Sequence, residues 1–329
     1  MTDLIDQYDA ALFDLDGVIY LGPEPIAYAA DSIERLRRQG IRPAFVTNNA
    51  GRSVQTVAAH LRECGIETAK EDIVTSAQAI ADLMVEELDE GSSVLVCGAP
   101  SLADEIASRG LRVVHQASDN PVAVVQGYDP QMTWPRIDEV CIAIQSGARW
   151  YASNPDTTRP TDRGIVPGAG AQIQAVRFTV DTDPVMAGKP YPPLLKTTVA
   201  RLGCSRPIFI GDRLDTDIEG AHRVGMDSFM VFTGAHGKKD LIAADEQHRP
   251  TAIGADLRWL FSPSRKVELS DSWARCGKVL VSCEGDRLLV DGLENSEDHY
   301  DALWAACHLV WYRQAPIDHD FLERLDAVR

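Results

Sequence analysis

Three aspartates stand at points where a short apolar run of the sequence ends. Asp14 and Asp16 follow the run at residues 10–13, and Asp212 follows the run at residues 207–210. Carboxylate oxygens are the ligands that Mg²⁺ prefers, and a carboxylate can also attack a substrate or transfer a proton. This pattern predicts carboxylate chemistry around a bound metal ion.

Two further segments supply neutral and positive groups. Thr47 and Asn48 follow an apolar run at residues 43–46, and Lys189 precedes a helical pattern at residues 192–202. A phosphate beside carboxylates is repelled by on the order of 4 kcal/mol per unit-charge pair at 4 Å and an effective dielectric near 20. Lys189 and a metal ion would offset this repulsion. The Thr47 hydroxyl and the Asn48 backbone N–H would complete a phosphate-binding loop.

The first two aspartates can divide the chemistry of phosphate-ester hydrolysis between them. Asp14 would attack phosphorus and become an aspartyl phosphate, while Asp16 would protonate the leaving group and later accept a proton from water. A calcium-binding EF-hand loop is excluded, because Val18 and Pro25 occupy positions that need ligand oxygens. Each motif alone has an ordinary interpretation as a turn, a helix cap or a surface lysine. Together, and each beside a predicted strand or helix entry, they favour a single site.

The elements that would hold these residues alternate between apolar runs and amphipathic stretches, which is typical of a parallel sheet covered by helices. In an open sheet of this kind, ligands bind beyond the carboxyl ends of the strands. The fold class predicted is therefore α/β, with a doubly wound parallel-sheet core. The further predicted strands are residues 94–97, 122–125, 150–152 and 228–232, and the predicted helices are residues 26–39, 53–64 and 217–224 and those beginning at 99 and 134.

The chain changes character at two places. A proline- and glycine-rich stretch at residues 154–170 is predicted to be a loop, and residues 262–264 resemble a linker. Beyond it we expect a hairpin over residues 278–290 and a helix over about 298–313, which form a small α+β module. The predicted layout is a core in two parts (residues 1–80 and 184–262), an inserted domain (residues 81–183) and an extension (residues 263–329).

Composition excludes several classes of partner. The formal net charge of −17 argues against nucleic acid and anionic membranes, which attract basic proteins. Apolar runs are too short to span a bilayer, and the first residues lack the layout of a signal peptide. The seven scattered cysteines include no Cys-x-x-Cys pair, which argues against a zinc site or a disulfide framework. A cytoplasmic location is predicted.

In this order, the four motifs resemble those of the haloacid dehalogenase-like superfamily. The matching segments are residues 13–17, 46–49, 188–190 and 211–218. The resemblance implies a Rossmann-like core, with Asp14 as the nucleophile and Asp16 as the acid/base. It also implies that Thr47, Asn48 and Lys189 hold the phosphoryl group.

The same resemblance implies a magnesium site. Asp212 would bind Mg²⁺ together with Asp14 and the backbone carbonyl of Asp16, and Asp217 would support the site. An aspartate at position 16 is typical of the phosphatases of this superfamily, since the dehalogenases lack it and transport ATPases have threonine there.

The insertion between the second and third motifs resembles the type IIA α/β cap of p-nitrophenyl phosphatase-like enzymes. In that group a cap loop over the active site helps to select the substrate. Asn49, Thr158 and Arg159 are the candidates for this role, although Arg159 could equally be an ordinary surface arginine.

The extension is similar to one found in actinobacterial glycerol 3-phosphate phosphatases, which makes glycerol 3-phosphate the best single substrate. Phosphoglycolate, pyridoxal phosphate, sugar phosphates and nucleoside monophosphates are the alternatives. A regulator that binds a phosphorylated metabolite without turnover is the alternative from another class. Apolar residues of the extension suit packing or a homodimer.

Overall fold

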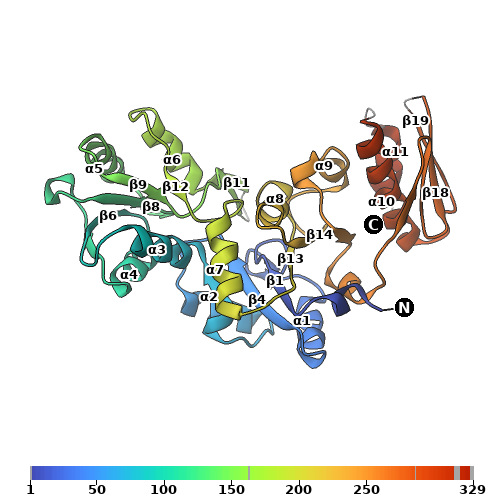
Figure 1. Cartoon of the computed structure of the whole chain (residues 1–329), viewed down its shortest axis with the longest axis horizontal. Helices are drawn as coiled ribbons and strands as arrows, with labels where there is room; N and C mark the ends of the chain where they lie inside the picture. Colours follow the sequence, from blue (N-terminus) through green and yellow to red (C-terminus); the bar gives the residue numbers. More distant parts are fainter. Residues whose placement is uncertain (1, 162–163, 286, 315–318, 327–329) are drawn as a thin grey trace. The chain divides into compact units, whose positions relative to one another are not determined.

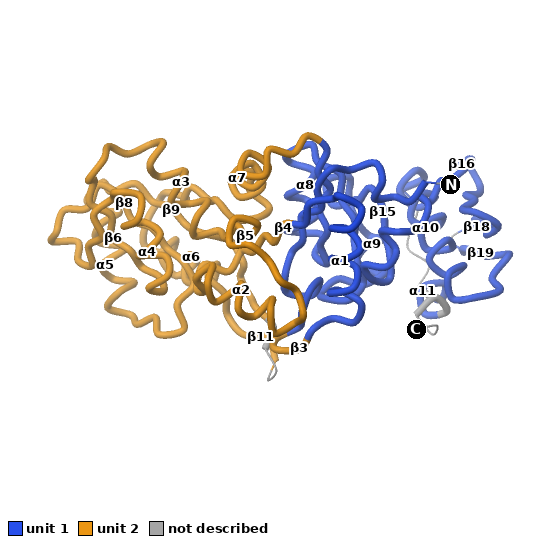
Figure 2. Tube along the Cα trace, turned by 90° about the horizontal axis from the view of Figure 1, so that it is seen from below, with its two compact units in different colours: residues 1–21, 25–43, 206–329 blue, residues 22–24, 44–205 orange. Residues whose placement is uncertain are grey.

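The computed structural model describes residues 2–161, 164–285, 287–314 and 319–326. The chain forms two compact units, coloured separately in Figure 2. Unit 1 comprises residues 1–21, 25–43 and 206–329, and unit 2 comprises residues 22–24 and 44–205. Each is described by itself below.

Unit 1 contains a parallel sheet with strand order β15-β14-β13-β1. Its strands are fully or largely buried and have few polar side chains, as expected for a sheet covered on both faces. The elements are β1 (Ala10–Phe13), α1 (Ala29–Arg38), β13 (Pro207–Gly211), the π-helical turn η4 (Leu214–Ile218), α8 (Glu219–Arg223), β14 (Asp227–Val231), α9 (Lys238–Ile242) and β15 (Ala252–Gly254).

The C-terminal extension belongs to unit 1 and is an antiparallel meander packed against a long helix (Figure 1). Its elements are β16 (Val267–Leu269), β17 (Trp273–Cys276), β18 (Val279–Glu284), β19 (Arg287–Asp291), α10 (Ser296–Arg313) and α11 (His319–Asp326). The α10 helix starts at an Asn295 cap, whose side chain accepts hydrogen bonds from the N–H groups of Glu297 and Asp298 at 2.9 and 3.1 Å.

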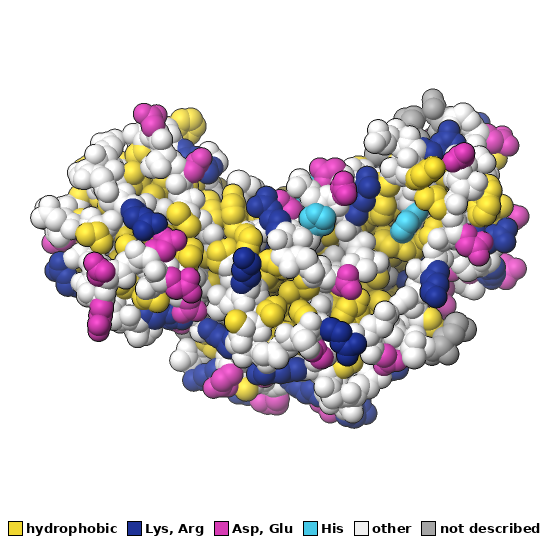
Figure 3. All heavy atoms as spheres, in the orientation of Figure 1, with side chains coloured by type: hydrophobic (Ala, Val, Ile, Leu, Met, Phe, Trp, Pro, Cys, Tyr) yellow, Lys and Arg dark blue, Asp and Glu magenta, His cyan; other side chains and the backbone are white. Residues whose placement is uncertain are grey.

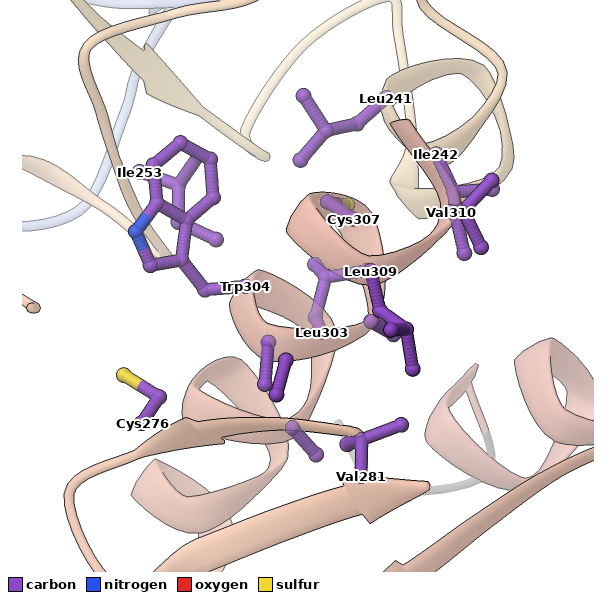
Figure 4. Packing of buried hydrophobic residues seen from close by; sticks show 14 of the residues in the cluster. Leu241, Ile242, Ile253, Cys276, Val281, Leu303, Trp304, Cys307, Leu309 and Val310 are labelled. Carbon is purple, nitrogen blue, oxygen red and sulfur yellow. The ribbon is translucent and has the colours of Figure 1, made fainter. Parts of the chain in front are cut away.

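One hydrophobic cluster joins the extension to the α/β part of unit 1 (Figure 4). Trp304 of α10 lies beside Ile253 of β15, and Cys307 faces Leu241 of α9. Val281 of β18 closes the cluster from the meander. The extension therefore shares a core with the sheet, which accounts for the stability of a segment too short to bury a large core alone.

Unit 2 combines a short parallel pair of strands with a second, larger sheet. Strands β4 and β5 pair in parallel, and α2 and α7 pack against β5. The elements of this part are β4 (Arg42–Thr47), α2 (Val54–Glu63), β5 (Ile73–Thr75), α3 (Ser76–Glu87) and α7 (Pro192–Leu202).

The larger sheet of unit 2 is wholly parallel, with strand order β12-β9-β8-β6-β7. Helices α3 and α4 lie on one face, and α5 and α6 lie on the other (Figure 1). The elements are β6 (Ser93–Cys97), α4 (Pro100–Ser108), β7 (Arg112–Val114), β8 (Ala123–Gln126), α5 (Trp134–Gln145), β9 (Arg149–Ala152), β10 (Thr158–Thr161), β11 (Gly164–Pro167), α6 (Ala169–Arg177) and β12 (Val185–Met186).

The predicted fold class is confirmed, since both units are α/β with parallel sheets. The loop predicted over residues 154–170 was partly wrong, because β10 and β11 form an antiparallel hairpin within it. The helix predicted from residue 217 begins earlier, at Leu214, as a π-helical turn. The compact units divide the chain at other residues than the predicted four-part layout, which stays a prediction.

Two general properties bear on the partners of the chain. On the face shown in Figure 3, acidic and basic side chains are interspersed rather than separated into regions of one sign. Among the described residues, no helix is both long and apolar enough to cross a membrane. Separately, all seven cysteines are free thiols.

Candidate active site

The register of unit 1 places Asp14 beside the start of the motif at Asp212. Phe13 of β1 lies opposite Ile210 of β13, and the Asp14 N–H donates to the Ile210 carbonyl oxygen at 2.9 Å. Because the strands are parallel, the residues that follow them emerge at the same edge of the sheet. Two segments about 200 residues apart in sequence therefore meet there.

Asp14, Asp212 and Asp217 form a carboxylate cluster. One oxygen from each lies within 4.8 Å of the others. The three side chains are 9%, 2% and 1% exposed. Burying carboxylates this close together is costly unless a cation or hydrogen-bond donors compensate for their charge.

The geometry of the turn η4 explains how Asp217 joins the cluster. Its Oδ2 accepts hydrogen bonds from the N–H groups of Asp212 and Arg213, at 3.2 and 3.1 Å. Asp215, two residues earlier, instead forms an exposed ion pair with Arg213 at 2.8 Å. Of the two aspartates within this turn, Asp217 joins the carboxylate cluster and Asp215 is exposed; the predicted supporting role of Asp217 stays a prediction.

A tight turn follows Asp14 and presents the exposed side chain of Asp16. The Gly17 N–H donates to the Tyr20 carbonyl oxygen at 2.8 Å, and Leu15 is fully buried beneath the turn. Gly17 has φ +91°, and a Cβ atom at this position would overlap the Asp212 carboxylate. Only glycine satisfies both constraints.

A second loop, residues 233–236 after β14, forms hydrogen bonds to both the turn at Gly17 and the segment of Asp212, and is called the clamp loop below. The Thr233 hydroxyl donates to the Gly17 carbonyl oxygen at 2.6 Å, and the Ala235 N–H donates to Asp212 Oδ2 at 2.6 Å. A Cβ atom on Gly234 would overlap the same carboxylate. His236 Nδ1 accepts from the Leu214 N–H at 2.8 Å, so this nitrogen carries no proton.

Sequence reasoning missed this clamp loop, residues 233–236. A usable signal was present, because Thr233 and Gly234 directly follow the predicted strand 228–232 at the edge where the other motifs stand.

The carboxylate cluster fits a hard divalent cation. Its donors are all oxygens, and Mg²⁺ is bound in proteins by one or a few carboxylates with water and substrate oxygens completing six ligands. Asp14 and Asp212 are the residues of the cluster that would hold the ion. Asp217 would orient the Asp212 segment, because its Oδ2 is already engaged with two backbone N–H groups.

Unit 2 holds the neutral and basic candidates, beginning with a compact loop after β4. Thr47 is 4% exposed, and its hydroxyl accepts from the Asn49 N–H at 3.0 Å. The Asn49 side chain in turn accepts from the Gly51 N–H at 2.9 Å. These local hydrogen bonds fix the conformation of the loop, and the Asn49 side chain takes part in them.

Lys189 is only 1% exposed and is among the largest fully buried side chains of the protein. A lysine buried to this extent requires negative partners. Its backbone N–H donates to Asn48 Oδ1 at 2.8 Å, and its carbonyl oxygen accepts from Asn48 Nδ2 at 2.9 Å. The structure therefore joins the segment of Lys189 to the loop after β4 within unit 2.

The two cap candidates lie on the β10 strand and are exposed. The Arg159 guanidinium lies over the Tyr128 ring, 4.9 Å from its centroid. This contact holds the arginine by a cation–π interaction. Thr158 pairs with Pro167 in the β10–β11 hairpin. The predicted role of both residues in selecting the substrate stays a prediction.

Comparison with known proteins adds family information to this geometry. Residues 11–112 match a family model described as haloacid dehalogenase-like hydrolase, and residues 186–260 match a related one described as HAD-hydrolase-like. A D-glycerol 3-phosphate phosphatase of Mycobacterium tuberculosis is 41% identical, over 99% of this chain and 92% of that protein. An acid sugar phosphatase of Staphylococcus aureus is 35% identical, over 71% of this chain and 90% of the relative.

Solved structures give the same picture. A crystal structure of the M. tuberculosis glycerol phosphate phosphatase in complex with magnesium matches with a TM-score of 0.89 and 38% identity, covering 100% of this chain and 99% of that one. A p-nitrophenyl phosphatase from Archaeoglobus fulgidus matches with a TM-score of 0.72 and 25% identity, covering 78% of this chain and 98% of that one. The C-terminal extension thus has a counterpart in the mycobacterial protein.

Proposed function

This chain belongs to the haloacid dehalogenase-like hydrolases, and from that premise we propose that it is a Mg²⁺-dependent phosphatase of small phosphate esters. The observation that carries the proposal is the carboxylate cluster of Asp14, Asp212 and Asp217, whose oxygens lie within 4.8 Å of one another. Such a cluster suits a divalent cation that neutralises the charge of the substrate phosphate.

Asp14 is the nucleophile of the proposed reaction. One of its carboxylate oxygens forms a bond to phosphorus, and the bond from phosphorus to the ester oxygen breaks, which gives an aspartyl phosphate. The backbone bond from the Asp14 N–H to Ile210 and the buried turn after it keep this side chain at the sheet edge. A fixed nucleophile lowers the entropic part of the barrier.

Asp16 moves the protons. Its exposed carboxyl group donates a proton to the departing alkoxide in the first step. In the second step it accepts a proton from the water that attacks phosphorus, and phosphate is released with Asp14 restored. Asp14 is only 9% exposed and Asp16 is exposed, so the two carboxyl groups lie in different surroundings and can take different tasks.

The remaining groups bind and orient the phosphate. When bound, Mg²⁺ supplies positive charge that stabilises the developing negative charge on the phosphoryl oxygens. Lys189 adds a second positive charge, and the Thr47 hydroxyl and the backbone N–H of Asn48 donate to phosphoryl oxygens.

Glycerol 3-phosphate is the substrate that we favour. The mycobacterial relative named for it matches the whole chain, including the extension, whereas the acid sugar phosphatase matches 71% of it. Arg159, held over Tyr128, and Thr158 and Asn49 are the proposed determinants of specificity. The alternatives are phosphoglycolate, pyridoxal phosphate, a sugar phosphate or a nucleoside monophosphate.

Two further properties are part of the proposal. A cytoplasmic location agrees with the free thiols at all seven cysteines. A homodimer would use apolar surface outside the shared core of unit 1. Size-exclusion chromatography with light scattering measures the oligomeric state directly.

Phosphate release from a panel of esters tests the proposed function. The wild-type protein should release phosphate from glycerol 3-phosphate with Mg²⁺, lose the activity with a chelator, and regain it when Mg²⁺ is restored. An Asp14→Asn protein prepared in parallel controls for contaminating phosphatases. If no ester releases phosphate while phosphate esters still bind, the chain is a binding protein and the enzymatic proposal is wrong.

A further inference from the structure

The side chain of Asn48 uses all of its hydrogen-bonding groups within unit 2. Its Nδ2 donates to the Lys189 carbonyl oxygen at 2.9 Å and to Asp156 Oδ1 at 3.1 Å, and its Oδ1 accepts from the Lys189 N–H at 2.8 Å. The two bonds to the Lys189 backbone fix the orientation of the amide. A flipped amide would place donor against donor and acceptor against acceptor.

The backbone carbonyl of Asn48 is anchored by two further residues. Its carbonyl oxygen accepts from the Ser76 hydroxyl at 2.5 Å and from Asn154 Nδ2 at 2.7 Å. Asn154 also accepts from the Asp156 N–H at 3.2 Å, which sets the start of the cap loop. One residue, 8% exposed, thus connects the loop after β4, the start of α3, the cap loop and the segment of Lys189.

Two glycines, Gly188 and Gly168, allow close packing around Asn48 and the cap loop. A Cβ atom on Gly188 would overlap the Ser153 carbonyl oxygen and lie 2.7 Å from Asn48 Oδ1. A Cβ atom on Gly168 would overlap the Asp156 carbonyl oxygen. The cap loop is therefore closely packed on both sides, and a shift at Asn48 has to move its neighbours.

These contacts separate the roles of two neighbouring residues. Both Nδ2 hydrogens of Asn48 are donated to protein oxygens. The group of Asn48 that can donate to a phosphate is therefore its backbone N–H. The side chain of Asn48 instead positions Lys189 and the cap loop at residues 154–156. This loop leads into Thr158 and Arg159.

We propose that Asn48 is a positioning residue. It couples the cap loop, residues 154–156, to Lys189, which binds the phosphate in the proposed function. The inference rests on the proposed phosphatase function. Because the distance between the two subsites is fixed through one amide, Asn48 sets the size of the ester that spans them. Removal of one partner of a buried hydrogen bond costs about 1–3 kcal/mol, which corresponds to roughly 5- to 150-fold in a rate or binding constant.

A charge swap between Asn48 and Asp156 tests the coupling. Asn48→Asp removes both donors and places two carboxylates together, so kcat/KM for glycerol 3-phosphate should fall about 100-fold. The inhibition constant of inorganic phosphate, which reports on Lys189, should rise about tenfold. In the double variant Asn48→Asp/Asp156→Asn, the amide at position 156 donates to the carboxylate at position 48. That variant should recover about tenfold of the loss.

A single change at Asp156 separates the two links. Asp156→Ala removes the bond to the cap loop and leaves both bonds to Lys189. It should lower the preference for glycerol 3-phosphate over p-nitrophenyl phosphate about fivefold, with the inhibition constant of phosphate unchanged. Asn295→Ala, which removes the amide cap of α10, is the matched control. It should lower stability but change neither the substrate preference nor the inhibition constant of phosphate.

Specific outcomes overturn the proposal. They are a charge swap no better than Asn48→Asp alone, or an Asp156→Ala protein whose preference equals that of the wild type. The inhibition constant and the swap can also be measured with p-nitrophenyl phosphate alone. A wild-type protein inactive on glycerol 3-phosphate would therefore contradict the proposed substrate and leave the charge-swap test of the coupling intact.

Discussion

The carboxylate cluster and the hydrophobic cluster around α10 lie in the same compact unit and are built in opposite ways. The first places Asp14, Asp212 and Asp217 within 4.8 Å of one another, where like charges repel. The second buries Leu303, Trp304 and their apolar neighbours in a hydrophobic cluster. The contrast indicates that the carboxylate cluster lowers the stability of the fold and that the hydrophobic cluster around α10 compensates for this loss.

Asp14→Asn gives the largest expected effect. Loss of the nucleophile should lower kcat by at least about 10⁴-fold, while the unfolding midpoint stays at or above that of the wild type. Steady-state kinetics and thermal unfolding measure the two quantities. Asp215→Asn, which removes an exposed carboxylate of the ion pair with Arg213, should change kcat less than about twofold. A similar loss in both variants would refute the assignment.

Gly234→Ala should act through the metal. The added methyl group would overlap the Asp212 carboxylate, so the Mg²⁺ concentration for half-maximal activity should rise about 10- to 100-fold. Calorimetric titration with Mg²⁺ gives the same quantity without turnover. Gly237→Ala is the matched control, since its nearest neighbour would lie 3.8 Å away. Equal Mg²⁺ affinities in the two variants would remove the clamp loop from the metal site.

Trp304→Ala tests the hydrophobic cluster. The side chain is 3% exposed and packs beside Ile253, so its removal should cost ~3–5 kcal/mol of unfolding free energy. In denaturant titrations the midpoint should fall, while kcat/KM of the remaining folded protein stays within about twofold of the wild type. A selective loss of kcat/KM without a loss of stability would mean that the extension has a direct role in the reaction.

His308 gives the smallest effect, which is a dependence of stability on pH. Burial lowers the pKa of His308 below its ordinary value of 6.5, and Arg249 lowers it further, against an opposing hydrogen bond with the Trp304 carbonyl oxygen. The unfolded chain therefore binds the proton more readily. As pH falls from about 7 through 6.5 towards the lowered pKa, stability should decrease. In His308→Gln this decrease should be smaller; an unchanged slope would contradict the assignment.

The sequence predicted the carboxylate cluster well because short motifs at strand ends carry it. The strands 10–13 and 207–210 were identified as buried apolar runs, and parallel pairing necessarily brings their ends to one edge. That Asp217 supports the site was implied by the resemblance to the superfamily and stays a prediction. The π-helical turn that presents Asp217 was not predicted, since a π turn has no distinct residue pattern.

Other parts depended on contacts that a sequence does not encode locally. The bonds of Asn48 join residues 28 to 141 positions apart, so its positioning role was not foreseen. The β10–β11 hairpin was missed because prolines and glycines in it favour a loop assignment. The strands β16 and β17 are short and partly polar, and only their pairing with β18 defines them.

The covalent role of Asp14 can be observed directly in an Asp16→Asn protein. p-Nitrophenolate leaves without a proton, so this variant should still transfer the phosphoryl group but fail to activate water. Rapid mixing with p-nitrophenyl phosphate and Mg²⁺ should give a burst of one p-nitrophenolate per chain. Mass spectrometry after acid quench should then locate one phosphoryl group on Asp14. Steady turnover without a burst, and with no phosphoryl group on the chain, would contradict a covalent mechanism.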